Sequence, residues 1–466
     1  MITAFEVNWL HKPTQASRPF AGTGSRLQHR DKEKFTFWWQ LVECGASSGG
    51  RRLSADKGTC MRVATIIGGM ATTLVLAASA AVAQPAFEWI VEPPGAANGR
   101  VADISADGQS VVGFRFVQEN GTSLPGFRWQ RGLGRVDYLQ PTFQVSQSNS
   151  TGISSDGRVV VGEGRDVNSQ VRERLYRSID NGPIELFVMP ANANRVLAGR
   201  SNGDGSKVIG LAQNVAFDGT IITQRPVLYT GLNTVVELPL PANGVDANRA
   251  ARDISADGSR IVGSVRDGSR GNRTHAVMWD SNLNASFMSV PADALNSFAY
   301  GTSRQNNFTV GMVRMADSSE QFARWQGDEL ITVPLPPRDA TTQWSDIQPT
   351  HISNDGSIAT GNLFYDAPSG GTFTAGFIWT PSTGIMLAKD YVLQLGASLP
   401  FPTNDIGVTD LVVSADGTTL AGQLGYRDAF GQGQPGSFVL TIPSSPTLGV
   451  ASLLLFACVR RRRHGV

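Results

Sequence analysis

Six aspartates recur at one place in a repeated motif, and their type and spacing are the first feature that could hold a cation. A calcium loop needs several spaced oxygen ligands and a more distant Glu. The motif lacks both, although Asn202 and Asp204 alternate as oxygen donors. We therefore expect these residues to organise turns and predict no metal site. They are Asp107, Asp156, Asp204, Asp257, Asp355 and Asp416.

Histidine and cysteine are scarce in the repeated part of the chain. His275 and His351 are its two histidines, and Cys44, Cys60 and Cys458 all lie outside it. We expect His351, which precedes a hairpin Ile, to be a structural strand residue. Two histidines without a cysteine are too few ligands for a transition-metal site. The absence of cysteine from the repeats also leaves them without a thiol nucleophile or a disulfide framework. No G-x-S-x-G elbow and no phosphate-binding or dinucleotide glycine pattern is present, so we predict no catalytic residues and no cofactor.

Three sets of side chains leave a binding or catalytic role open. Aromatic residues recur in the third run of each unit and could form a sugar-stacking surface, although a fixed repeat position favours packing in the core. Repeated arginines could gather over a central channel and bind an anion, although solvated strand faces are the simpler expectation. Carboxylates from distant units could pair for glycoside chemistry. The aromatics are Trp129, Tyr176, Tyr229, Trp279, Trp325 and Trp379, and the arginines include Arg128, Arg177 and Arg324.

The element that must position these residues is a unit of about 50 residues that occurs seven times. Each unit has a β-prone run, a Ser-x-Asp-Gly turn and a second run that ends in glycine, and the turn is weaker in the third unit and degenerate in the fifth (Ser303, Gln305, Asn306). The closing glycine comes six positions after the Asp position in every unit. A spacing kept over seven copies indicates a repeat architecture. The closing glycines are Gly113, Gly162, Gly210, Gly263, Gly311, Gly361 and Gly422, with spacings of 49, 48, 53, 48, 50 and 61 residues.

The motif predicts a β-hairpin, and the whole unit predicts a propeller blade. Glycine supplies the positive φ of a tight turn, and the Asp side chain accepts backbone N–H groups within it. A third run such as Gly126 to Trp129 and a fourth such as Thr234 to Leu238 complete four short strands. We therefore predict an all-β, seven-bladed β-propeller over residues 84–442. The last unit lacks a fourth run, and Phe87 to Val91 is expected to supply that strand and close the ring.

The units resemble the HAF family of extracellular repeats, whose pattern joins an Ile-Ser-x-Asp-Gly hairpin to an Ala-Phe-Arg-Trp-like strand. The resemblance covers about Val101 to Leu440. The turn is also similar to the TolB-type propeller repeat, which usually carries Pro there. The resemblance implies an extracellular location and a propeller-like fold, and it implies no reaction.

Residues 61–83 are typical of a secretory signal peptide. Arg62 supplies the positive end, an apolar stretch follows, and Ala81 and Ala83 form an A-x-A cleavage site. Since a signal stands at a chain start, we interpret residues 1–60 as a mis-called start or a disordered extension.

The C-terminal residues 443–466 resemble the PEP-CTERM sorting signal of bacterial exported proteins. A Pro-containing motif that ends at Pro446 precedes an apolar run and a terminal cluster of arginines, with Ser-Ser-Pro in place of Pro-Glu-Pro. The resemblance implies processing by an exosortase-type enzyme after transient association with the inner membrane. The cluster is expected to stay cytoplasmic, and it consists of Arg460, Arg461, Arg462 and Arg463.

The formal net charge of +1 averages unlike segments. Residues 84–443 contain 24 Arg and 2 Lys against 34 Asp and Glu, which gives this body a charge of −8. An acidic body is unsuited to nucleic acid, which needs a basic surface.

Taken together, these features of the sequence favour an exported, non-enzymatic surface or matrix protein that binds a glycan or protein partner through a propeller face. The alternative is a secreted glycosidase or lyase. Acidic, His or Tyr side chains that converge at the mouth of the channel would favour this alternative.

Overall fold

The computed structural model describes residues 85–91, 99–115, 126–137, 145–166, 173–336, 344–366, 372–396, 407–427 and 433–442. The predicted extension, signal peptide and sorting signal lie outside these residues, as do their processing positions Ala81, Ala83, Pro446 and Arg460 to Arg463. Within the described residues, no helix is both long enough and apolar enough to cross a membrane.

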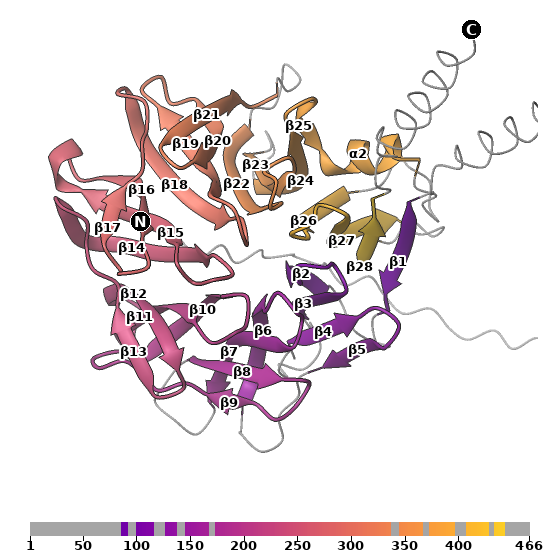
Figure 1. Cartoon of the computed structure of the whole chain (residues 1–466), viewed down its shortest axis with the longest axis horizontal. Helices are drawn as coiled ribbons and strands as arrows, with labels where there is room; N and C mark the ends of the chain where they lie inside the picture. The colour runs from indigo at the N-terminus through magenta and orange to yellow at the C-terminus, as the bar shows by residue number, and fades with distance from the viewer. Residues whose placement is uncertain are drawn as a thin grey trace, which may run out of the picture. The chain divides into compact units, whose positions relative to one another are not determined.

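Seven four-stranded antiparallel sheets make up the described part of the chain, and they are arranged as the blades of a β-propeller (Figure 1). The first strand of each blade faces the centre of the ring, so the prediction of a seven-bladed all-β propeller is confirmed. The blades are blade 1, with β2 (Gly99–Ile104), β3 (Ser110–Arg115), β4 (Phe127–Gln130) and β5 (Gly134–Asp137); blade 2, with β6 (Val145–Ile153), β7 (Val159–Asp166), β8 (Arg174–Ile179) and β9 (Glu185–Leu186); blade 3, with β10 (Arg195–Ser201), β11 (Val208–Val215), β12 (Ile221–Gly231) and β13 (Thr234–Glu237); and blade 4, with β14 (Gly244–Ile254), β15 (Ile261–Asp267), β16 (Arg273–Trp279) and β17 (Ala285–Phe287).

The other three blades follow the same plan, with one helix added. They are blade 5, with β18 (Ala294–Thr302), β19 (Phe308–Met315), β20 (Glu320–Gln326) and β21 (Glu329–Pro334); blade 6, with β22 (Trp344–Ile352), β23 (Ala359–Asp366), β24 (Thr372–Thr380) and β25 (Gly384–Leu387); and blade 7, with β26 (Gly407–Val413), β27 (Thr419–Arg427), β28 (Gly433–Thr441) and β1 (Ala86–Ile90). A short 3-10 helix, η1 (Gly268–Arg270), lies in blade 4, and helix α2 (Ala388–Gln394) joins blades 6 and 7.

The Ser-x-Asp-Gly turns adopt the predicted hairpin conformation. In blade 1 the Asp107 carboxylate accepts hydrogen bonds from the Ser105 hydroxyl at 2.6 Å and from the Gln109 backbone N–H at 3.0 Å. Gly108 has a φ of 68°, and the turn glycines of five other blades are also left-handed. The same pair of hydrogen bonds recurs at Asp156, Asp257, Asp355 and Asp416. The repeated aspartates therefore act as turn acceptors.

Hydrogen bonds also join each turn to the next one around the ring. The backbone N–H of Ala106 donates to the Ser155 carbonyl of blade 2 at 2.9 Å, and Ser155 donates to Gly203 of blade 3 at 2.7 Å. The pattern continues through Ala256 and Arg304. In blades 1 to 4 and 6, the backbone N–H of the residue between the Ser and Asp positions thus donates to the next blade.

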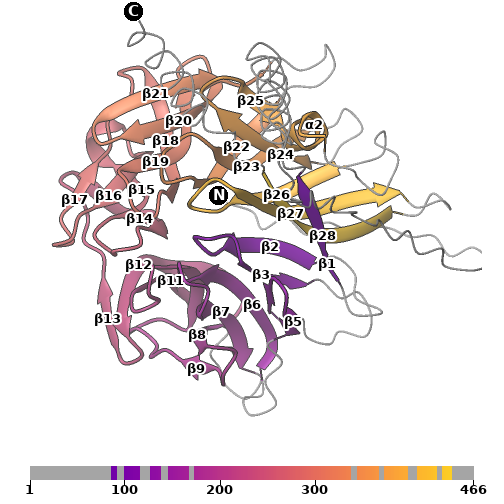
Figure 2. The same ribbon diagram turned by 45° about the vertical axis from the view of Figure 1, so that its right-hand side comes forward.

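Strand β1 is the outer strand of blade 7 and pairs with β28 in antiparallel register, with Phe87 opposite Leu440 and Trp89 opposite Phe438 (Figure 2). The Phe87 ring stacks on the Phe438 ring at 5.4 Å. The importance of this strand for ring closure stays a prediction.

The repeated aromatic residues are core residues, as their fixed position favoured. Trp279 and Trp325 have no exposed surface, and Trp129 and Trp379 are at most 5% exposed. Tyr176 is buried too, but it does not occupy the place of Trp129. It pairs with the closing Gly162, as Phe127 pairs with Gly113. The expectation that these residues form a sugar-stacking surface is therefore wrong.

Candidate functional site

Asp103 of β2 lies at the centre of a polar cluster in which residues of several blades meet, and we call this the channel cluster. Its Oδ1 accepts hydrogen bonds from the Ile104 N–H at 2.8 Å and from His351 Nε2 at 3.2 Å, and it lies 2.8 Å from Arg200 Nη1. Its Oδ2 accepts from the Ile153 N–H at 3.0 Å and from Arg304 Nη2 at 3.2 Å. The side chain is 1% exposed. One carboxylate therefore has partners on blades 1, 2, 3, 5 and 6.

Arg304 extends this network across the ring. Its Nη1 donates to the Ser201 carbonyl at 3.0 Å, and its Nη2 donates to the Ile153 carbonyl at 3.1 Å. Blade 4 contributes Asp253, whose Oδ2 accepts the Thr302 N–H at 2.8 Å. Arg200 and Arg304 act electrostatically on both carboxyl groups, so the formal charges of the two arginines and the two aspartates balance.

The cluster sets the ionisation of its members. Burial opposes a charge on Asp103, but Arg200 and Arg304 outweigh it and hold the pKa of this carboxyl far below its usual range. Burial and the nearby Arg200 lower the pKa of His351 to about 4. The neutral imidazole can then donate from Nε2 to Asp103 while its Nδ1 accepts from the Thr350 hydroxyl at 3.0 Å. For Asp253, burial dominates and raises the pKa.

The channel cluster does contain two carboxylates and a histidine, which is the arrangement that would favour an enzyme. Its chemistry is nevertheless that of a structural linkage. Asp103 is saturated with donors and inaccessible, so it can neither abstract a proton from a substrate nor supply one. His351 lies on strand β22, as expected, and is partly buried, although its contact across the ring was not foreseen.

The sequence contained a signal for this cluster. The residue that precedes the Ile-Ser pair is Asp103 in blade 1, and it becomes Arg200, Asp253 and His351 in blades 3, 4 and 6. Arg304 occupies the turn position that is usually small, within the degenerate fifth motif. The informative positions were therefore the departures from the repeat.

The arginines singled out from the sequence do not gather in the channel. Arg128 is buried on β4 and donates to Asn181 Oδ1 at 3.0 Å. Arg177 pairs with Glu185 on the neighbouring strand at 2.6 Å, and Arg324 lies 5.0 Å over the Phe308 ring. Both expectations for Arg128, a channel position and a solvated face, are wrong because it fills a polar niche between blades.

A second acidic group lies between blades 5 and 6. Glu320 accepts a hydrogen bond from Arg314 Nε at 2.8 Å and also contacts Asp346. Burial and the neighbouring Asp346 raise the pKa of Glu320 to about 7 against the effect of Arg314. The pKa of Asp346 is raised as well, mainly by burial. Asp346 thus disfavours ionisation of Glu320, whereas the hydrogen bond from Glu320 favours ionisation of Asp346.

An aromatic cleft of about 640 Å³ lies between blades 6 and 7. Trp344 at the start of β22 and Tyr365 on β23 line it, with ring centroids 5.8 Å apart. Phe373 stacks on the other side of Tyr365 at 5.2 Å and is 45% exposed. In blades 4 and 5 the pair corresponding to Trp344 and Tyr365 is Gly244 with Asp267 and Ala294 with Met315. The aromatic pair is therefore not part of the repeated core.

Helix α2 builds the other wall of the cleft. It accounts for part of the long 61-residue spacing between Gly361 and Gly422. Lys389 and Asp390 lie on its first turn and line the cleft. Apolar residues of β25 complete the lining. The cleft thus combines aromatic surface with a few charged groups, as ligand sites commonly do.

In the part of the chain that the structure describes, no group of three or more His, Cys, Asp or Glu side chains is placed to hold a metal ion.

No family model and no curated protein matches the chain. The solved structures that resemble it include a puromycin-hydrolyzing peptidase of Mycobacterium tuberculosis, with 14% identity, a TM-score of 0.46 and coverage of 77% of this chain and 55% of that one. They also include the BP39L lectin of Burkholderia pseudomallei, with 11% identity, a TM-score of 0.40 and coverage of 75% of this chain and 99% of that one. The Cps50 (Swd1) propeller domain of Myceliophteria thermophila has 11% identity, a TM-score of 0.40 and coverage of 71% of this chain and 94% of that one. The chain spans about half of the peptidase, and these likenesses concern the fold alone.

Proposed function

We propose that the protein is an exported surface or extracellular-matrix protein that binds a glycan in the cleft between blades 6 and 7 and does not cleave it. The observation that carries this proposal is the aromatic pair Trp344 and Tyr365, which is partly exposed in a cleft of about 640 Å³. Flat aromatic rings cover the apolar faces of sugars, while adjacent polar groups fix orientation. Lys389 and Asp390 supply such groups from α2.

Export is the second part of the proposal, and it is supported by the sequence. Residues 61–83 would direct secretion, and residues 443–466 would hold the protein at the inner membrane until an exosortase-type enzyme releases it. The acidic body suits a neutral or cationic partner better than nucleic acid. A glycan or surface protein outside the cell fits this combination.

A secreted polysaccharide-cleaving enzyme is the second candidate. The observation that favours it is the Glu320–Asp346 pair, because a carboxyl whose pKa is about 7 can serve as a general acid near neutral pH. The Glu320 side chain, however, is only 4% exposed and is paired with Arg314. Binding without cleavage therefore agrees better with the accessible surface.

A glycan array of the purified full chain, run beside a hydrolysis assay on the glycans it binds, tests the proposal. We expect binding without product release, and we expect Trp344→Ala to weaken binding at least tenfold. Phe217→Ala is the matched control, because Phe217 is fully exposed on blade 3 away from the cleft. Cleavage that Glu320→Gln abolishes would establish the enzyme instead. Equal binding by both aromatic variants would exclude the cleft.

A further inference from the structure

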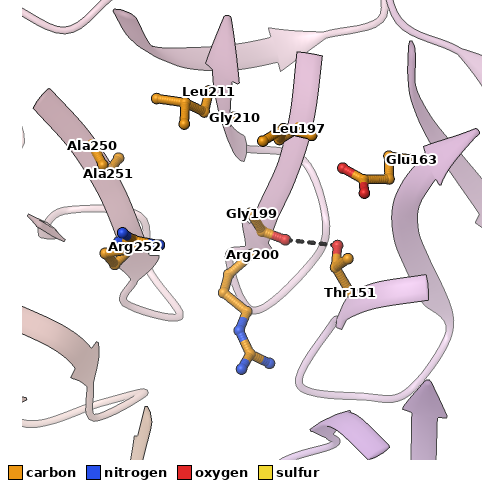
Figure 3. A pocket seen from close by; sticks show the side chains of 10 residues that line it. All are labelled: Thr151, Glu163, Leu197, Gly199, Arg200, Gly210, Leu211, Ala250, Ala251 and Arg252. Carbon is orange, nitrogen blue, oxygen red and sulfur yellow. Dashed lines mark hydrogen bonds between the residues drawn. The ribbon is translucent and has the colours of Figure 1, made fainter. Parts of the chain in front are cut away.

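A second cavity, of about 320 Å³, lies beside the channel cluster between blades 2, 3 and 4. Leu197 and Leu211 of blade 3 form an apolar wall, while Glu163 of β7 and Arg252 of β14 lie on opposite sides (Figure 3). The Thr151 hydroxyl, on the Glu163 side, donates to the Gly199 carbonyl at 3.0 Å. The cavity is therefore apolar at its centre and carries opposite charges at its two sides.

Arg252 is the cation that a ligand can use. Arg200 also lines the cavity, but its guanidinium is paired with Asp103 at 2.8 Å. Arg252 is exposed, and its guanidinium lies 5.9 Å over the Tyr300 ring. Among the described residues, no carboxylate lies within ion-pair distance of Arg252. An arginine held by an aromatic ring and open to solvent is suited to bidentate recognition of a carboxylate.

The opposite side of the cavity suits hydrogen-bond donors. The Glu163 Oε1 accepts from the Asn149 amide at 3.3 Å, and a carboxylate can accept several bonds at once. A ligand anchored by its carboxylate at Arg252 could therefore donate hydroxyl groups toward Glu163. The small volume limits the ligand to about one sugar ring or a molecule of similar size.

We propose that this cavity binds a small hydroxycarboxylate of the sugar-acid class, with its carboxylate on Arg252 and its hydroxyl groups directed to Glu163. This site is separate from the aromatic cleft and does not depend on glycan binding there. It differs from the cleft in requiring a negative charge on the ligand.

Isothermal titration of the full chain with glucuronate, glucose and acetate tests the proposal. These probes separate the carboxylate from the hydroxyl-bearing ring. We expect glucuronate to bind and to raise the melting temperature, and we expect both glucose and acetate to bind at least tenfold more weakly. Arg252→Gln should weaken glucuronate binding about tenfold or more, because a charge-assisted contact is lost. Arg266→Gln is the matched control, since Arg266 lies on neighbouring β15 outside the cavity lining.

Four results would overturn the assignment. Equal binding of glucose would remove the need for the carboxylate, and equal binding of acetate would remove the need for the hydroxyl groups. Full glucuronate affinity in a folded Arg252→Gln protein would exclude this cavity. Trp344→Ala should leave glucuronate binding unchanged, and its loss in that variant would move the ligand to the aromatic cleft.

Discussion

The turns of the repeat and the channel residues beside them are close neighbours in the chain, yet they are built in opposite ways. Asp107 belongs to a turn that recurs with the same hydrogen bonds in blade after blade. Asp103, four residues earlier, belongs to a position that differs between blades and binds partners on four other blades. The turns give each blade its shape, while the varied positions give the assembled ring its specific contacts.

The largest effect is expected at Asp103. Asp103→Asn leaves Arg200 and Arg304, which are only partly exposed, beside a neutral side chain, and breaking a buried ion pair costs about 3–5 kcal/mol. Chemical denaturation should show a loss of this size. If Asp103→Asn costs no more than Asp107→Asn, the channel cluster does not hold the blades together.

The edge of blade 7 provides a second large effect. Ile90 on β1 is 1% exposed in a core cluster with Val101 and Val439, so Ile90→Ala should lower the free energy of unfolding by about 2–4 kcal/mol in the same denaturation experiment.

The contribution of β1 to ring closure can be measured separately with Ala86→Cys and Thr441→Cys, which lie opposite each other. In a protein whose three native cysteines are replaced by Ser, this pair should cross-link under mild oxidation. A folded protein that forms no cross-link would show that the two ends are not neighbours.

A single turn should contribute less. Gly157 has a φ of 74°, and a Cβ there would lie 2.7 Å from the Ser110 hydroxyl. Gly157→Ala should therefore destabilise the protein by about 1–2 kcal/mol, measured by the same denaturation. Gly132→Ala is the control, since its φ is also positive but nothing crowds its Cβ position. If Gly157→Ala and Gly132→Ala lose the same stability, the whole cost comes from the backbone conformation and none from the crowded Cβ position.

Much of the fold followed from the repeat because each Ser-x-Asp-Gly turn is a local feature. The Asp and Gly act within a few residues, so their role could be read without knowing the blade's neighbours. The contacts of Arg304 and His351 could not be predicted in this way, because they join residues about 200 and 250 positions from Asp103. The predicted place of Tyr176 failed for a related reason, since the register of its strand depends on pairing with β7. The aromatic cleft depends on α2, which lies in the one long spacing.

The smallest stability effect is expected from pH at Glu320. Its pKa is raised from 4.5 to about 7, so between these values the folded state retains a proton that the unfolded state has released. Raising the pH through this window therefore favours unfolding. Relative to Glu320→Gln, the wild type should lose about 1 kcal/mol of stability between pH 5.5 and 6.5. Parallel stability curves for the two proteins would show that Glu320 ionises normally.

Calorimetric titration of one array-selected glycan into Trp344→Ala and Asp257→Ala tests most directly whether the varied positions, and not the repeated turns, carry binding. Asp257 belongs to the repeated turn of blade 4 and has no place in the cleft. We predict that Trp344→Ala loses at least tenfold in affinity, while Asp257→Ala binds as the wild type does despite lower stability. Normal binding by Trp344→Ala together with lost binding by folded Asp257→Ala would contradict this account.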